Sequence, residues 1–190
     1  MTSLESLDSM EQVAREIARC TLCPLHRSRT HPVPGEGRVP ARLMVVGEGP
    51  GRQEDAAGRP FVGAAGQLLD RMLQAIHLDR TEVFIANVVK CRPPQNRTPT
   101  DEEIEACAPF LARQIALVDP EVILVLGATA AKALLGADTR ITQVRGQWQP
   151  WGERAVMPTY HPAYLLRDPR QKVVVWEDLR QVADRLGIAL

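Results

Sequence analysis

The 190-residue sequence has no net charge and no long apolar run, and both absences exclude classes of protein. Its 23 basic and 23 acidic side chains cancel at pH 7, so overall charge does not favour binding to nucleic acid. No apolar stretch approaches the roughly 18 residues that cross a membrane as a helix. The N-terminal stretch is acidic and lacks the basic and apolar blocks of a secretory signal. We therefore expect a cytoplasmic protein without a membrane partner.

Internal repeats and low-complexity segments are absent as well. With 45% hydrophobic and 24% charged residues, the composition is typical of a globular protein. A chain of this length can bury a substantial core as one unit. We predict a single domain over residues 1–190, whose first helix, at about residues 1–19, leads into a cysteine-containing region. Local charge is concentrated at residues 15–42, where arginines outnumber acidic residues, although such a run is more often a solvated face than a phosphate-binding surface.

The apolar pattern predicts strands alternating with helices. Short apolar runs that are typical of buried strands occur at residues 43–46, 83–86, 122–126 and 155–159. Helical spacing of apolar residues recurs at about residues 10–20, 68–76, 104–115, 128–135 and 175–186. Residues 24–40 and 47–63 are expected to form loops. Four apolar strands separated by helices predict a parallel sheet covered on both faces, and ligands bind such sheets at the carboxyl ends of the strands.

Four cysteines, Cys20, Cys23, Cys91 and Cys107, indicate ligands or packing rather than disulfides in a reducing compartment. Cys20 and Cys23 form a CxxC pair at a predicted helix end, where both thiolates can reach one metal centre. Cys91 closes a predicted strand and Cys107 lies inside a helix, so each is either a further ligand or a buried apolar filler. Zinc sites favour two close pairs and iron–sulfur clusters accept scattered thiolates, which favours iron–sulfur only slightly.

A glycine-rich loop, residues 47–51 with the sequence GEGPG, follows the first predicted strand. It lacks the Gly-Lys-Ser/Thr of a P-loop and the spacing of a dinucleotide-binding loop, and its carboxylate would repel phosphates. We predict a catalytic role for Glu48, the alternative being a solvated side chain in a tight turn. Farther along the same loop region, Phe61 suits either a stacking platform for a planar base or a core anchor.

Polar residues also follow the other predicted strands. Asn87 ends the second strand, and its amide both donates and accepts hydrogen bonds. His161 follows the last strand at the same edge of the sheet, although a lone histidine is more often structural than catalytic. Leu165, Leu166 and Arg167 then place apolar tips beside a cation, a combination able to wedge a base step and hold phosphate.

Taken together, these segments resemble family 4, the iron–sulfur family, of the uracil-DNA glycosylase superfamily. The resemblance rests on GEGPG, GRPFVG, NVVKCRPPQN, HPAYLLR and the cysteine pattern, and spans about residues 20–186. It implies a three-layer α/β/α sandwich around a four-stranded parallel sheet, with a [4Fe–4S] cluster on the four cysteines. It also implies a monofunctional, monomeric DNA-repair enzyme. Such an enzyme flips deoxyuridine out of single- or double-stranded DNA, hydrolyses the N-glycosidic bond and leaves an abasic site.

The resemblance assigns roles to individual residues. Phe61 would stack on uracil, and Asn87 would pair with its N3–H and O4. His161 would donate a hydrogen bond to O2, where negative charge gathers as the base leaves. Glu48 would orient or deprotonate water, or stabilise the cationic sugar. Leu165, Leu166 and Arg167, as one segment, would contact DNA and brace the gap.

Three more residues receive substrate-binding roles from the resemblance: Gly47 and Gly49 in the glycine loop, and Glu54 near uracil C5. The related family 5 lacks an acidic residue where Glu48 stands, and the loop at residues 92–97 lacks the histidine of a group that bonds covalently to DNA. Two other hypotheses remain open on the residues alone. One is a non-catalytic DNA-binding module with a structural metal, and the other is a zinc-stabilised hydrolase of free nucleotides.

Overall fold

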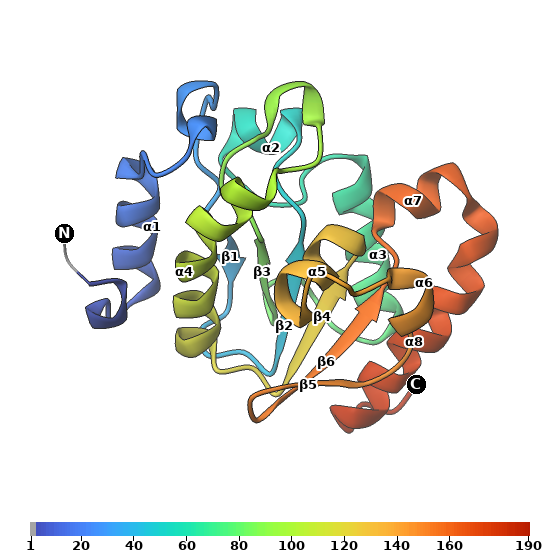
Figure 1. Cartoon of the computed structure of the whole chain (residues 1–190). Helices are drawn as coiled ribbons and strands as arrows, with labels where there is room; N and C mark the ends of the chain where they lie inside the picture. The colour runs from blue at the N-terminus through green and yellow to red at the C-terminus, as the bar shows by residue number, and fades with distance from the viewer. Residues whose placement is uncertain (1–2) are drawn as a thin grey trace.

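A six-stranded sheet lies at the centre of the computed structural model, which describes residues 3–190 (Figure 1). Its middle consists of parallel strands in the spatial order β3 (Phe84–Asn87), β2 (Leu43–Gly47), β4 (Val122–Leu126) and β6 (Arg154–Thr159). Each edge carries a short antiparallel strand, β1 (Glu36–Gly37) beside β3 and β5 (Gln149–Trp151) beside β6. The four parallel strands are confirmed, whereas the prediction that the sheet has four strands is wrong. The added strands have two and three residues and no apolar run, so the pattern did not reveal them.

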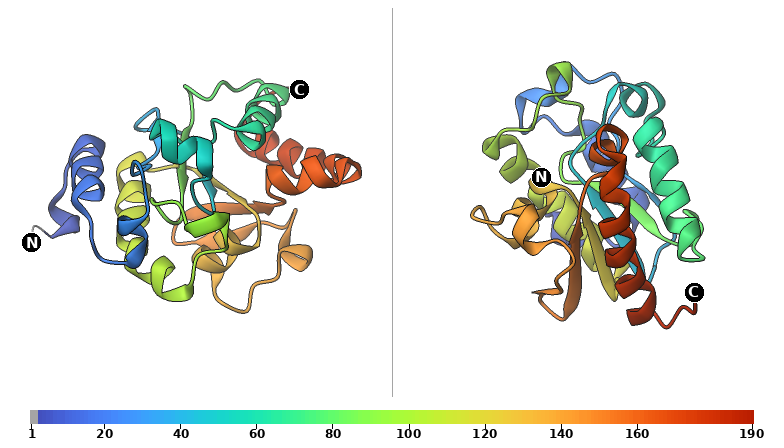
Figure 2. Two further views of the ribbon diagram at one scale, coloured as in Figure 1. Left: turned by 90° about the horizontal axis from the view of Figure 1, so that it is seen from above. Right: turned by 90° about the vertical axis from the view of Figure 1, so that its right-hand side faces the viewer.

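Helices cover both faces of this sheet, which gives the predicted three-layer α/β/α arrangement (Figures 1 and 2). One face packs against α1 (Met10–Arg19), α4 (Asp101–Val118) and α5 (Ala128–Leu135). The other face packs against α3 (Ala64–Ala75), α7 (Pro162–Arg167) and α8 (Lys172–Arg185). Two further short helices are α2 (Arg52–Ala57) and α6 (Ile141–Val144). The chain also contains the 3-10 turns η1 (Leu4–Ser6), η2 (Pro24–Arg27), η3 (Pro94–Asn96) and η4 (Pro169–Gln171).

The apolar core is divided by the sheet into two clusters. In β2, Met44 and Val46 face the α1, α4 and α5 side, while Leu43 and Val45 face the α3 and α8 side. All four are at most 1% exposed. Since both faces of the strand are buried, both sets of alternating positions must be apolar, which produces the continuous apolar run seen in the sequence.

Local sequence explains where the helices begin and end. Thr100 caps α4: its side chain accepts from the Glu103 amide, and the Glu103 carboxylate accepts from the Thr100 amide. α2 lies inside the segment 47–63 that was predicted to be a loop. Its sequence RQEDAA contains good helix formers, but it was not predicted because it has no apolar stripe. Gly58, with φ of +69°, ends it in the left-handed conformation. The predicted domain starts at residue 1, and residues 1–2 lie outside the described part.

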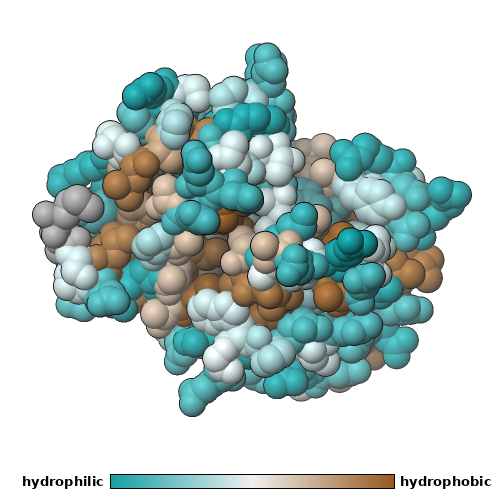
Figure 3. All heavy atoms as spheres, in the orientation of Figure 1, coloured by the Kyte–Doolittle hydropathy of each residue, from teal (hydrophilic) through white to brown (hydrophobic). Residues whose placement is uncertain are grey.

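Within residues 3–190, no helix combines the length and the apolar character that crossing a membrane would require. In the view of Figure 3, hydrophilic residues cover most of the surface, and hydrophobic residues show in smaller areas between them.

Candidate active site and cysteine centre

The carboxyl ends of the four parallel strands meet at one edge of the sheet. Gly47, the last residue of β2, is in register with Asn87, the last residue of β3. Leu126 at the end of β4 is in register with Thr159 at the end of β6, and the amide of Gly127 donates to the Thr159 carbonyl at 2.9 Å. The segments that follow these strands therefore start side by side, as the sequence predicted.

A small pocket opens at this edge. It is lined by Gly49, Gly51, Glu54, Phe61, Ala65, Asn87 and His161. All but Gly51 and Ala65 were predicted as site residues, and Gly51 and Ala65 add little bulk that a sequence pattern could reveal. The pocket encloses about 120 Å³, which is room for a single planar ring rather than a whole nucleotide. A larger groove of about 650 Å³ lies at the opposite edge of the sheet, away from these side chains.

Phe61 forms one wall of the pocket and is also a core residue, so it is a core anchor, and its role as a stacking platform stays a prediction. Its side chain is 5% exposed, and its ring stacks against His161 with centroids 5.7 Å apart and an interplanar angle of 27°. Gly47 leaves the space that this ring needs. A Cβ at that position would lie 2.5 Å from Phe61 Cζ and 2.6 Å from Asn87 Oδ1, so any larger residue would displace the pocket wall.

Asn87 presents a polar atom without a partner. The residue is 2% exposed, and its Oδ1 is buried with no hydrogen bond from any described residue. Such a buried acceptor is costly unless a donor reaches it, and native structures contain few of them. Because Asn87 lines the pocket, an N–H group of a bound ligand could supply that donor.

His161 is held as a neutral hydrogen-bond donor. It caps α7, where its Nδ1 accepts from the amide of Ala163 at 3.0 Å. In a neutral ring this leaves the proton on Nε2. Burial, and then the charge of Arg167, lower the pKa of His161 to about 4, although Glu54 opposes them. The ring is therefore uncharged at neutral pH, and its Nε2–H suits a developing negative charge better than it suits proton transfer.

Glu48 stands beside the pocket rather than in its lining. It follows β2 directly and is partly exposed, and its Oε2 accepts a hydrogen bond from Thr129 Oγ1 at the start of α5. Thr129 was missed by the sequence reasoning, although the loop after β4 was predicted to reach this edge. The available signal was that Thr129 has a hydroxyl and lies three residues after the end of β4.

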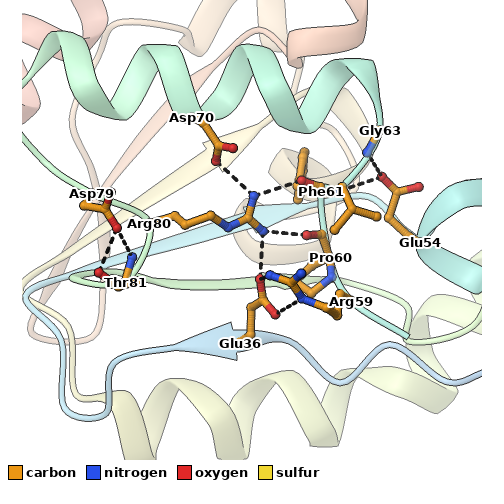
Figure 4. Close-up of polar contacts among 11 residues, drawn as sticks. Glu36, Glu54, Arg59, Pro60, Phe61, Gly63, Asp70, Asp79, Arg80 and Thr81 are labelled. Carbon is orange, nitrogen blue, oxygen red and sulfur yellow. Dashed lines mark hydrogen bonds and ion pairs between the residues drawn. The ribbon is translucent and has the colours of Figure 1, made fainter. Parts of the chain in front are cut away.

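Glu54 lines the pocket and also fixes its backbone. Its Oε1 accepts from the amides of Val62 and Gly63, both at 3.1 Å (Figure 4). These amides lie directly after Phe61, so Glu54 helps to set the path of the chain that carries the ring.

Leu165 does not reach solvent, which corrects the prediction that it contacts DNA. The segment after His161 is the short helix α7, and successive residues of a helix point about 100° apart. Leu165 is therefore directed into the core and is 1% exposed, whereas Leu166 is 44% exposed. Arg167 is also exposed. Only Leu166 and Arg167 of the predicted set are placed to contact a large ligand.

The four cysteines line a single cavity. Cys20 follows α1, Cys23 precedes η2 and Cys107 lies in α4. Cys91 lies beyond β3, which ends at Asn87, so the prediction that it closes the strand is corrected. All four are free thiols. Within residues 3–190, no three His, Cys, Asp or Glu side chains form a compact group for a single metal ion.

The thiols of this cavity are partly or fully buried, and one of them accepts a hydrogen bond from a cation. Arg29 Nη1 donates to Cys91 Sγ at 3.1 Å. Burial raises the pKa of the Cys23 and Cys91 thiols, and raises that of Cys107 to about 11. Without a metal these thiols are protonated at neutral pH, so metal binding must displace their protons.

Lys90 joins the cysteine cavity to the pocket strand. Its side chain is buried, lines the cavity, and donates from Nζ to the Asn87 carbonyl and to Gln114 Oε1, both at 2.6 Å. Burial lowers the pKa of Lys90 to about 8, although the nearby thiols of Cys107 and Cys91 oppose the shift. One ammonium group thus contacts the backbone that carries Asn87 and faces the cysteines.

Comparison with known proteins identifies the family. The model of the uracil DNA glycosylase superfamily matches residues 34–180, which include the whole pocket lining. The chain belongs to this superfamily.

Curated relatives place it within the superfamily. The type-4 uracil-DNA glycosylase of Thermotoga maritima is 49% identical, covering 90% of this chain and 92% of the relative. The type-4 enzyme of Sulfurisphaera tokodaii is 46% identical, covering 94% of this chain and 85% of the relative. That of Archaeoglobus fulgidus is 42% identical, covering 95% of each chain. This superfamily member therefore groups with the type-4 enzymes, as the sequence motifs predicted.

Proposed function

We propose that this chain is a DNA-repair glycosylase that hydrolyses the N-glycosidic bond of deoxyuridine in DNA. The reaction releases uracil and leaves an abasic site. The unpartnered Asn87 Oδ1, in a pocket for one ring beside the neutral His161, is the observation that carries this proposal. The name shared by its type-4 relatives supports it. The single domain, the monomeric state and the cytoplasmic location predicted from the sequence belong to the same proposal.

Asn87 selects the base. Its Oδ1 accepts the N3–H of uracil and its amide group donates to O4. Cytosine presents an acceptor at N3 and a donor at position 4, so both contacts would be lost and Oδ1 would stay unpaired. Sites that hydrogen-bond a ligand in this way reject a mismatched analogue strongly. Phe61 stacks on the selected ring.

His161 stabilises the leaving group. As the bond between C1′ and N1 breaks, its electron pair stays with the base, and negative charge gathers on uracil O2 and N1. The Nε2–H of a neutral His161 donates to O2, and the Ala163 amide holds the ring in the tautomer that makes this possible. Because the pKa of His161 is lowered to about 4, the ring keeps its own proton and acts electrostatically.

Glu48 acts on the other side of the breaking bond. Thr129 holds one of its carboxylate oxygens, which leaves the second free to orient water toward C1′ or to face the cationic sugar. The water oxygen bonds to C1′, and its proton passes to the carboxylate or to solvent. The base leaves as its anion and takes a proton from solvent at N1, so the products are uracil and the abasic sugar.

The substrate is uracil-containing DNA, single- or double-stranded. Flipping a base out of a duplex costs a few kcal/mol, so contacts that brace the opened strand are needed. Leu166 and Arg167 are both exposed at the end of α7, whose N-cap is His161, and the pair suits a wedge and a phosphate contact. With zero net charge, the chain holds DNA through such local contacts.

The four cysteines are the proposed ligands of a [4Fe–4S] cluster. An all-thiol donor set fits such a cluster, and Arg29 and Lys90 supply positive charge beside it. When bound, such a cluster would order the loops that carry Cys20, Cys23 and Cys91, and it would take no part in the hydrolysis.

The direct test uses an oligonucleotide with one uracil. Iron-loaded protein should release uracil and leave an alkali-labile site, whereas Glu48→Gln should act roughly 100-fold more slowly or worse. The exposed Glu153→Gln serves as the matched control and should act like the wild type. Wild-type protein that binds DNA but releases no uracil from either single or double strands would identify a binding module instead. Full activity with zinc and no iron would contradict the cluster assignment.

A further inference from the structure

Arg80 makes a set of contacts directly behind the pocket wall (Figure 4). It lies in the turn between α3 and β3, and its side chain is 18% exposed. Nη1 donates to the Phe61 carbonyl and to Asp70 Oδ1, both at 2.9 Å. Nη2 donates to the Pro60 carbonyl at 2.7 Å and to Glu36 Oε1 at 3.0 Å. The guanidinium therefore binds the two consecutive carbonyls that flank the Phe61 backbone.

Phe61 has a backbone conformation that needs such support. Its φ is +51°, in the left-handed region that bulky residues rarely adopt. A residue persists there only when its surroundings over-determine it. One of these surroundings is α3, which packs closely against the Phe61 backbone at Gly66. A Cβ at Gly66 would lie 1.8 Å from the Phe61 carbonyl oxygen and would prevent this close approach. Arg80 is another of these surroundings, because its Nη1 donates to the same carbonyl.

We propose that Arg80 is a positioning residue for base stacking. It fixes the Pro60 and Phe61 carbonyls, and thereby the plane in which the Phe61 ring faces the pocket. Asp70 from α3 and Glu36 from β1 hold the guanidinium in turn, so the ring orientation depends on α3, on β1 and on the turn that carries Arg80. The inference rests on the proposed function of Phe61 as the ring that stacks on uracil.

Planar geometry is essential to this role. Four donors in a fixed fork serve two carbonyls and two carboxylates at once, which a lysine ammonium with three donors on a flexible stem cannot reproduce. Arg59 provides a matched comparison. It pairs with the same Glu36 through two hydrogen bonds, yet donates to neither carbonyl.

The first experiment compares Arg80→Met with Arg59→Met in iron-loaded protein. Arg80→Met should slow single-turnover uracil release roughly 10- to 100-fold, because a small misplacement of a positioning group has effects of this size. It should also weaken inhibition by free uracil. Arg59→Met should stay within about twofold of the wild type, since exposed ion pairs contribute little. An Arg80→Met protein with wild-type release and wild-type uracil inhibition would overturn the proposal.

A double-mutant cycle with Phe61→Leu separates positioning from general stability. If Arg80 acts through Phe61, then Arg80→Met should add little to the defect of Phe61→Leu. Fully additive defects would contradict the proposal. Should Arg80→Met fail to fold, Arg80→Lys keeps the charge and takes its place in the same cycle, with circular dichroism melting as the check on folding.

Failure of the proposed function looks different from failure of this inference. A wild-type protein that releases no uracil contradicts the function. Binding of free uracil, measured by calorimetry in the wild type and Arg80→Met, then still tests positioning without catalysis. Equal affinity in both proteins would contradict it.

Discussion

The pocket and the cysteine cavity lie at opposite ends of the short segment from Asn87 to Cys91, but they are built differently. The pocket rests on strand ends that are in register and on side chains fixed by protein hydrogen bonds, such as His161 held by Ala163. The cysteine cavity takes its four thiols from two loops and one helix, and burial raises the pKa of the Cys23, Cys91 and Cys107 thiols. The pocket is thus preorganised by the chain itself, whereas a metal centre bound in the cavity would have to displace protons from buried thiols.

This difference separates the effects expected of mutations. Changes in the pocket should alter the rate of uracil release and leave iron content unchanged. Changes in the cavity should alter iron content and stability first. Lys90, which contacts both regions, should affect both.

The largest effect is expected for His161→Ala. Removing a donor to a developing negative charge lowers a rate by about 100- to 1000-fold. Single-turnover release of uracil measures this loss, and iron content per chain should not change. The wild-type pH–rate profile should show no inflection near pH 6.5, because the pKa of His161 is lowered to about 4 and the ring stays neutral until the pH falls that far.

Two results would contradict this assignment. One is a His161→Ala protein with wild-type rate. The other is a loss of wild-type activity that follows protonation near pH 6.5 and disappears in the variant.

Cys23→Ala should act mainly on stability. Loss of one thiolate weakens cluster binding, so iron content should fall well below that of the wild type and the thermal midpoint should drop by several degrees. Ser28→Ala, an exposed change in the same region, is the control. A variant that keeps its iron and its midpoint would remove Cys23 from the ligand set.

A smaller effect on both regions is expected for Lys90→Met. The substitution keeps the apolar stem but leaves the Asn87 carbonyl and Gln114 Oε1 without their donor, which costs about 1–3 kcal/mol for each unsatisfied group. Denaturant unfolding measures that loss. Iron should also dissociate faster in the presence of a chelator, and uracil release should slow severalfold.

Lys132→Met, on the exposed side of α5, is the matched control. If Lys90→Met changed only the stability and neither iron loss nor the rate, the two regions would be independent and the comparison above would be wrong.

The sequence predicted the fold where local pattern is strong. The parallel strands are continuous apolar runs and α4 has apolar residues at helical spacing, so both were found. β1 and α2 were missed, since neither has an apolar period. Leu165 was assigned to the DNA surface together with Leu166 and Arg167, as apolar tips beside a cation, but its position in α7 directs it into the core.

Site residues were predictable when they follow strands. Asn87 and His161 stand at or just after strand ends, and the resemblance supplied their roles. Thr129 contacts Glu48, which is 81 positions away in the sequence. Arg80 contacts Phe61, which is 19 positions away. No spacing rule in one sequence encodes such contacts, because they depend on how separate elements pack.

The central claim is that the pocket at the carboxyl edge of the sheet recognises and releases uracil. It is tested most directly by incubating iron-loaded protein with two oligonucleotides that differ only in carrying uracil or cytosine at one position, and detecting the free base by mass spectrometry. We predict free uracil from the first and no free cytosine from the second. Absence of free uracil, or equal release of both bases, would contradict the claim.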